Sequence, residues 1–223
     1  MAERPSDFSY DVISDEKLGA GGFLIIRRLH LKVARPDGSR SKEGIYDLVE
    51  RPFGLDAVVL AIYRRTVGGK IEILLREGAR VPLAFGRPET GTAPQKSRAH
   101  RPIVEFVAGI LEAGEDSLEM VRERAAAEAL EEAGFRVAAD AVEMIGPPMF
   151  PTPGMCPEKF YFAAVEIAAA AQSEDPPGDG SPFEEGARLF WLDLNEALDR
   201  CKRGELEDLK TELLIRRLKD RLG

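Results

Sequence analysis

Three glutamates, Glu128, Glu131 and Glu132, occupy positions i, i+3 and i+4 of one segment. If that segment is helical, the spacing places all three carboxylates on one face, about a turn apart. Carboxylate oxygens are the ligands that Mg²⁺ prefers, and a cation held there would stabilise negative charge building up on phosphate oxygens. The same pattern also fits a solvated acidic face balanced by Arg122 and Arg124, so the spacing alone leaves both interpretations open.

The residues around these glutamates favour a site. Ala108-Gly109 and Gly114-Glu115 indicate a tight loop directly before the segment, and Gly134 follows it as a stop signal. A helix is expected from about Ser117 to Ala133, capped by Asp116 or Ser117. The carboxylates would then lie on a helix that begins just after a glycine-containing loop.

This loop and helix resemble the signature box of the Nudix hydrolase family. The helical half reads AEALEEAGF over residues 127–135, and the loop half reads AGILEAGE over residues 108–115. Within each half the spacing agrees with the family, except that Ala127 stands where the family has an arginine.

The two halves of the box are out of register with each other. Eleven residues instead of seven separate Glu115 from Ala127, a difference of about one helical turn, so an added turn would leave the carboxylate face intact. Either Glu115 or Glu119 then fills the first glutamate position of the box, and we favour Glu115. Arg124, four residues before Glu128, is the candidate substitute for the missing arginine, although it would also serve as an ordinary surface residue.

Four further stretches resemble the ADP-ribose and nucleoside diphosphate sugar pyrophosphatases of that family. They are LLREGARVPL (74–83), EFVAG (105–109), TPG with a downstream glutamate (152–158) and GELEDLKT (204–211). Each has a structural alternative, such as a plain turn or a surface ion pair. Their common order along the chain makes chance improbable.

The resemblance implies roles for particular residues. Metal would be held by the Ala108 carbonyl, Glu115, Glu128 and Glu132, with Mg²⁺ as the cofactor and Mn²⁺ as a substitute. Substrate would be bound by Arg80, Glu105, Gly109, Gly154 and Glu158. Asp208 and Lys210 in the last stretch are expected to be structural.

The base that activates the attacking water is left open. In the ADP-ribose branch it is often a glutamate on a loop before the last strand, which makes Glu184 and Glu185 candidates here. Glu131 is the rival base, and Arg124 would take the catalytic role of the family's arginine, which orients a neighbouring glutamate. The alternative for residues 184 and 185 is a solvated acidic loop without a catalytic role.

The elements that must position these residues indicate an α/β (α+β) fold. Strands are expected over 23–33, 44–50, 56–64, 70–77, 103–107, 160–167 and 188–192, and further helices over 195–203 and 206–222. We expect a Nudix-type α/β/α sandwich with a mixed sheet at 55–223, and a small N-terminal antiparallel β domain at 1–54. By resemblance that domain would complete a homodimer. A proline- and glycine-rich loop at 84–101 would cover substrate, contact a partner or be solvated.

Composition excludes several classes of protein. The net charge of −8 disfavours nucleic acid, no apolar run is long enough for a membrane span, and MAERPSDF lacks a secretion signal, so we expect a cytoplasmic protein. Two cysteines and two histidines, without metal-ligand spacing, argue against zinc and a Ser-His-Asp mechanism.

The function expected from the sequence is Mg²⁺-dependent hydrolysis of the pyrophosphate bond of ADP-ribose or a nucleoside diphosphate sugar, giving a nucleoside monophosphate and a sugar phosphate. Ala127 and the four-residue mismatch keep open a second hypothesis, a catalytically impaired Nudix-fold binding or regulatory protein. A structural protein with a merely acidic helix is the third, which the ordered motifs argue against.

Overall fold

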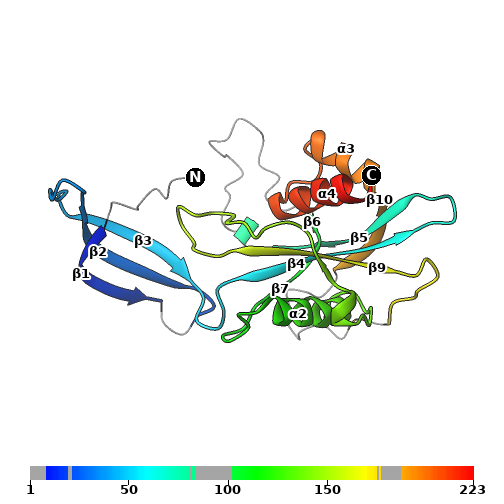
Figure 1. Ribbon diagram of the computed structural model, residues 1–223, viewed down its shortest axis with the longest axis horizontal. Coiled ribbons are helices and arrows are strands. Elements are labelled where there is room, and N and C mark those ends of the chain that lie inside the picture. Colours follow the sequence, from blue (N-terminus) through cyan, green and yellow to red (C-terminus); the bar gives the residue numbers. More distant parts are fainter. Residues whose placement is uncertain (1–8, 20–21, 81, 84–101, 175, 177–186) are drawn as a thin grey trace.

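The computed structural model describes residues 9–19, 22–80, 82–83, 102–174, 176 and 187–223. In these ranges two separate sheets are formed (Figure 1). The elements in chain order are β1 (Ser9–Leu18), β2 (Ile25–Ala34), β3 (Gly44–Glu50), β4 (Ala57–Arg65), β5 (Ile71–Gly78), β6 (Ile103–Glu105), β7 (Val107–Ile110), α2 (Leu118–Glu131), a 3-10 turn (Ala139–Ala141), β8 (Glu143–Met144), β9 (Phe160–Ile167), β10 (Arg188–Asp193), α3 (Leu194–Lys202) and α4 (Leu209–Leu222).

The main body is a sandwich around a mixed sheet in the order β10-β5-β4-β9-β8, with β6 paired to β5 and β7 paired to β4. Strands β4 and β9 are parallel, and the other pairs are antiparallel. Helix α2 covers one face, while α3 and α4 cover the other (Figure 1). The expected α/β/α architecture is therefore confirmed.

Strand β4 is the centre of this sandwich because it is apolar on both faces. Its first seven residues, AVVLAIY, are all buried. Alternate side chains enter two cores: Val59 and Ala61 pack toward α3 and α4, whereas Val58 and Leu60 pack toward α2. A strand buried on both sides loses the polar alternation of a surface strand, as this run shows.

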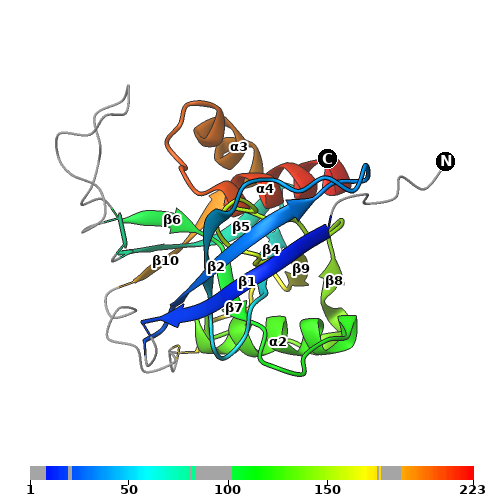
Figure 2. The same ribbon diagram turned by 90° about the vertical axis from the view of Figure 1, so that its left-hand side faces the viewer.

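The N-terminal sheet has the order β1-β2-β3 and is antiparallel throughout. It projects from one end of the body, and Figure 2 views the molecule from that end. The backbone amide of Val49 donates to the Met155 carbonyl at 2.9 Å, which ties the sheet to the body. The division of the chain at residue 54 stays a prediction.

Several element boundaries differ from the expectations, each for a physical reason. The strand expected at 103–107 is two strands, because the buried Phe106 interrupts it and its amide donates to Thr211 Oγ1 instead of to a neighbouring strand. The last helix starts at Leu209 instead of 206 because Asp208 caps it. Strand β1 was not expected, because its sequence is rich in charged residues. In the structure these residues form ion pairs with β2, such as that between Asp15 and Arg27.

Candidate functional site

Helix α2 carries the predicted carboxylates and is positioned by signals at both ends. The Ser117 side chain accepts a hydrogen bond from the Met120 amide at 3.2 Å, which confirms the cap. At the other end Gly134 has a φ of 69°, and its amide donates to the Leu130 carbonyl. A Cβ at Gly134 would stand 2.0 Å from the Glu174 carbonyl oxygen, so only glycine fits.

The centre of the candidate site is the contact between Glu128 and Gly109. A Cβ built on Gly109 would lie 1.8 Å from Glu128 Oε1 and 2.1 Å from its Cδ. The carboxylate therefore fills the space that any larger residue at position 109 would occupy. This explains physically why the loop half of the box needs glycine at this point.

Glu132 is held against the next residue of β7. The Ala108 amide donates to Glu132 Oε2 at 3.2 Å, and the Glu132 side chain is only 9% exposed. The Leu111 amide donates to the Asp56 carbonyl, so in the alternating antiparallel ladder the amide and carbonyl of Ala108 point away from β4. The Ala108 carbonyl is thus on the same open side as the Ala108 amide that holds Glu132.

Arg76 of β5 is a residue of this site that the sequence interpretation missed. Its Nη1 lies 4.0 Å from Glu132 Oε1, and its side chain is 8% exposed. Arg76 and Leu74 have the same parity on β5, and Leu74 packs in the core beneath α2. The available signal was an arginine directly after the buried run Ile73, Leu74 and Leu75.

Arg124 joins α2 to the loop before it. Its guanidinium donates to both oxygens of Glu115, at 3.2 and 2.9 Å, and lies 2.9 Å from Glu112 Oε1. Burial alone would raise the pKa of the Glu115 carboxyl, but the bonds from Arg124 and from the Glu112 amide outweigh it and hold that pKa below its usual range. Glu119, the alternative for the first box glutamate, is exposed in the first turn of α2.

Glu105 lies at the centre of a second charged cluster and is almost fully buried. Arg80 donates to its Oε1 at 2.7 Å, and Lys210 Nζ donates to its Oε2 at 2.6 Å. Lys210 also contacts Asp208, the residue that caps α4. Asp208 and Lys210 thus have structural contacts, as expected, while the predicted substrate roles of Arg80 and Glu105 stay predictions.

Two other predicted substrate residues, Gly154 and Glu158, lie near the junction with the N-terminal sheet. Glu158 accepts a hydrogen bond from Arg51, and Gly154 belongs to a turn in which the Met155 amide donates to the Thr152 carbonyl. Glu184 and Glu185, the candidate bases, and the loop at 84–101 lie outside the described residues.

The oxygen donors around Glu128 decide whether a metal ion fits this site. Among the described residues, no three carboxylate, imidazole or thiol groups stand close enough together to hold a metal as placed. Glu115 is turned toward Arg124, and Glu132 toward the Ala108 amide. Each carboxylate oxygen has a second lone pair, and Glu128 over Gly109, Glu132 and the Ala108 carbonyl are all hard oxygen donors. This donor set suits Mg²⁺ or Mn²⁺.

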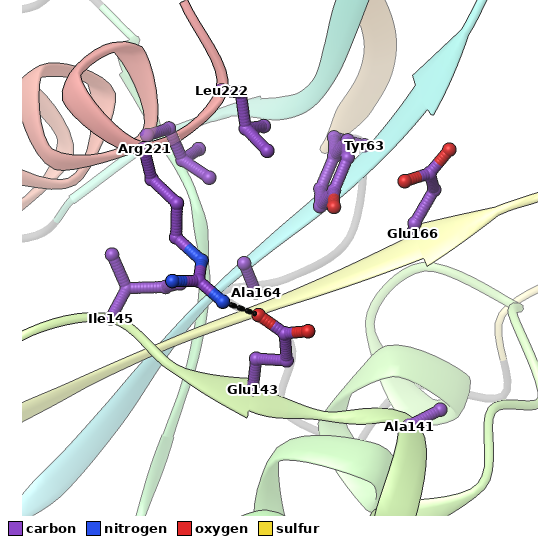
Figure 3. A pocket seen from close by; sticks show the side chains of 9 residues that line it. Tyr63, Ala141, Glu143, Ile145, Ala164, Glu166, Arg221 and Leu222 are labelled. Atoms are coloured by element: carbon purple, nitrogen blue, oxygen red, sulfur yellow. Dashed lines mark hydrogen bonds and ion pairs between the residues drawn. The ribbon is translucent and has the colours of Figure 1, made fainter.

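Two hollows in the described part of the chain lie away from the candidate site, and these carboxylates line neither of them. One of about 260 Å³ lies between β4, β8, β9 and α4; Figure 3 shows Arg221 reaching Glu143 across it. The other, about 410 Å³, is lined by residues that follow α2 and by the end of β9.

In the described ranges no helix is both long and apolar enough to cross a membrane.

No model of a protein family matches the chain. Across 91% of its length and 92% of the relative's, the chain is 26% identical to a protein named GDP-mannose pyrophosphatase from Cronobacter sakazakii. The solved structure of an ADP compounds hydrolase superposes with a TM-score of 0.65 at 14% identity, covering 96% of this chain and 94% of that one. A C. elegans Ap4A hydrolase superposes with a TM-score of 0.48 at 18% identity, covering 75% of this chain and 97% of that one. This superposition is too weak to support a conclusion about the fold.

Proposed function

Starting from the assignment to the Nudix hydrolases, which motif, fold and the 26%-identical relative support together, we propose that this chain hydrolyses the pyrophosphate bond of a nucleoside diphosphate sugar or ADP-ribose. The products would be a nucleoside monophosphate and a sugar phosphate. The observation that carries the proposal is the Glu128 carboxylate seated in the space that Gly109 leaves, beside Glu132 and the Ala108 carbonyl.

A divalent cation, Mg²⁺ or Mn²⁺, would supply charge neutralisation for the phosphate oxygens when bound. Glu128, Glu132 and the Ala108 carbonyl would hold it, with Glu131 and Glu115 assisting through water. The chain's own contribution is to fix these oxygens in place: Gly109 gives Glu128 its space, and the Ala108 amide orients Glu132. Such fixed donors lower the cost of reorganisation during reaction.

The attacking water needs a base within hydrogen-bond reach. Glu131 of α2 is one candidate, and Glu184 and Glu185, outside the described residues, are the others. Arg124 would act indirectly, by holding Glu115 in place. The family has its box arginine about one turn later on the helix, at the position of Ala127 in this chain. Arg80, Glu105, Gly154 and Glu158 stay candidates for substrate binding.

The experiment that tests this proposal is a substrate panel. Purified protein is incubated with ADP-ribose, ADP-glucose, GDP-mannose, UDP-glucose and coenzyme A in Mg²⁺ or Mn²⁺, and products are identified by phosphorus NMR. Turnover of a nucleoside diphosphate sugar or ADP-ribose to two phosphomonoesters is expected. A folded protein that hydrolyses none of them would overturn the enzyme assignment.

The second candidate is a binding or regulatory protein of the same fold, favoured by Ala127 in place of the box arginine. It predicts binding of ADP-ribose or a nucleotide sugar, measured by calorimetry, without metal-dependent turnover. The panel and the calorimetry together separate the two functions.

We also propose that the chain forms a homodimer through the N-terminal sheet. Nine of its exposed large apolar side chains lie between residues 12 and 53: Val12, Ile13, Leu18, Phe23, Leu24, Ile26, Ile45, Tyr46 and Phe53. Six of them lie on β1, β2 and β3, and Phe23, Leu24 and Phe53 lie beside these strands; so many exposed apolar side chains in one small region are typical of a covered surface.

A further inference from the structure

Arg76 is a buried cation directly beside the proposed metal ligands. Its side chain is 8% exposed, and Nη1 stands 4.0 Å from Glu132 Oε1. An arginine that remains charged at every working pH is seldom buried without a carboxylate partner. Its position on β5 faces α2, on the side of the sheet where Glu128 sits over Gly109.

The electrostatic environment gives this arginine a function. Glu128 and Glu132 are one turn apart on α2, and two anions held that close repel each other in a region of low dielectric. A fixed positive charge at 4.0 Å lowers that repulsion, although it also opposes the entry of another cation. The positive charge of Arg76 therefore raises the stability of the metal-free protein and lowers the affinity of the site for a metal ion.

We propose that Arg76 is the built-in counter-cation of this carboxylate site. It positions Glu132 and neutralises its charge in the metal-free protein. The same positive charge weakens the binding of a divalent cation, so that the metal ion is able to leave the site and be replaced. The inference rests on the metal site of the proposed function. Arg76 is a positioning residue and is not required to touch the substrate.

The test compares Arg76→Met, which removes the charge but keeps an unbranched side chain, with Arg76→Lys, which keeps the charge. Binding of Mn²⁺ is followed by electron paramagnetic resonance on the full chain, and thermal unfolding is measured with and without Mn²⁺. Arg76→Met should bind Mn²⁺ about tenfold more tightly than the wild type, since a unit charge is lost close to the site. Arg76→Lys should stay within about threefold of the wild type.

Linkage requires a matching change in stability. Without metal, Arg76→Met should unfold at a lower temperature than the wild type, and saturating Mn²⁺ should raise its unfolding temperature by more than it raises that of the wild type. A purely structural role for Arg76 would lower the unfolding temperature in both metal states without tightening Mn²⁺ binding. That outcome would overturn the inference.

The matched control is Arg64→Met. Arg64 is also a half-buried arginine of the main sheet, with its guanidinium on Glu72 and over the Trp191 ring at 4.0 Å. It lies six residues along β4 from Val58, the partner of Gly109, or about 20 Å away. Its loss should lower stability and leave Mn²⁺ affinity unchanged.

The experiment also separates this inference from the proposed function. Wild-type protein that binds no Mn²⁺ would remove the metal site itself, and the inference with it. Wild-type protein that binds Mn²⁺ as well as Arg76→Met does would leave the proposed function standing and refute the role of Arg76 alone.

Discussion

At the scale of single residues, the candidate site depends on where one side chain is missing. Gly109 has no Cβ, and the Glu128 carboxylate occupies that space. Glu132, one turn later, is fixed by the Ala108 amide. The spacing of the glutamates predicts that they share a helix face, but only the close approach of β7 makes that face a candidate site.

Gly109→Ala should displace Glu128 without unfolding the protein. The added methyl would stand 1.8 Å from Glu128 Oε1, and the flexible glutamate is able to move away. We expect at least about a tenfold loss of Mn²⁺ affinity, measured by paramagnetic resonance, because one oxygen donor leaves the cluster. Gly68→Ala, with nothing closer than 4.0 Å to its new methyl, is the control and should bind Mn²⁺ like the wild type. Equal affinities in the two variants would contradict the placement of Glu128 at the metal.

Glu132→Gln should lower the turnover rate on the preferred substrate by at least about a hundredfold, since a neutral amide replaces a carboxylate that is proposed to hold the metal. Glu123→Gln makes the same chemical change at an exposed position of the same helix and should keep nearly full activity. Steady-state kinetics measure both variants. If Glu132→Gln keeps the wild-type rate, Glu132 is not part of the site.

At the scale of elements, the bond between Arg124 and Glu115 connects α2 to the loop before it. The sequence suggested Arg124 as the substitute for the missing box arginine and placed it within reach of Glu128. In the structure its partners include Glu115 and Glu112, which precede the helix. Helical periodicity identifies neighbours on one helix, but it contains no information on how a loop folds back against that helix.

Glu115→Gln should lower the free energy of unfolding by about 1 to 2 kcal/mol at pH 7, because a charged hydrogen-bond acceptor of Arg124 is lost. The pKa of Glu115 is lowered in the folded protein, so its contribution is complete well above the ordinary value of 4.5 and is lost as the pH falls through the folded pKa. Urea unfolding at several pH values should therefore show the difference between variant and wild type shrinking toward acid.

The Glu123→Gln variant serves again as the control, because Glu123 is exposed on the same helix. Its unfolding free energy should differ from the wild type by less than about 0.5 kcal/mol across the same pH range. A pH-independent loss in Glu115→Gln would instead mean that the bond to Arg124 is not what stabilises the loop.

The expected elements and the observed ones agree best where the pattern is longest. Strand β9 coincides with its prediction at Phe160–Ile167, and the two-face burial of β4 follows from its apolar run. The break at Phe106 was not predictable from the local sequence, since the partner of its amide, Thr211, is 105 residues away. Arg76 was missed for the same reason: its partner, Glu132, comes from α2.

At the scale of the whole molecule, most of the apolar side chains of the N-terminal sheet are not fully covered by other parts of the described chain. In the described part of this sheet, only Leu31 is among the buried apolar residues, whereas Ile45 is 61% exposed and Tyr46 is 55% exposed. Three strands alone are barely enough for independent stability. A second copy of the chain is the partner that we propose for this sheet.

Light scattering at micromolar concentration should give a mass near twice the 24.5 kDa of one chain. Ile45→Asp should shift the protein toward monomer, because it places a charge among the exposed apolar side chains of the sheet. Val67→Asp, on the fully exposed turn between β4 and β5, is the control and should leave the mass unchanged. A monomeric wild type would refute the dimer.

The contacts of Glu105 and Phe106 with Lys210 and Thr211 affect the order in which parts of the protein fold during synthesis. Glu105 and Phe106 directly precede β7, the strand that carries Ala108 and Gly109, and they are held by side chains about a hundred residues later in the chain. During synthesis, which proceeds from the N-terminus, those side chains emerge from the ribosome about a hundred residues after the segment that they hold. The contacts at the start of β7, which carries Gly109 beside Glu128, therefore form only after Lys210 and Thr211 have left the ribosome.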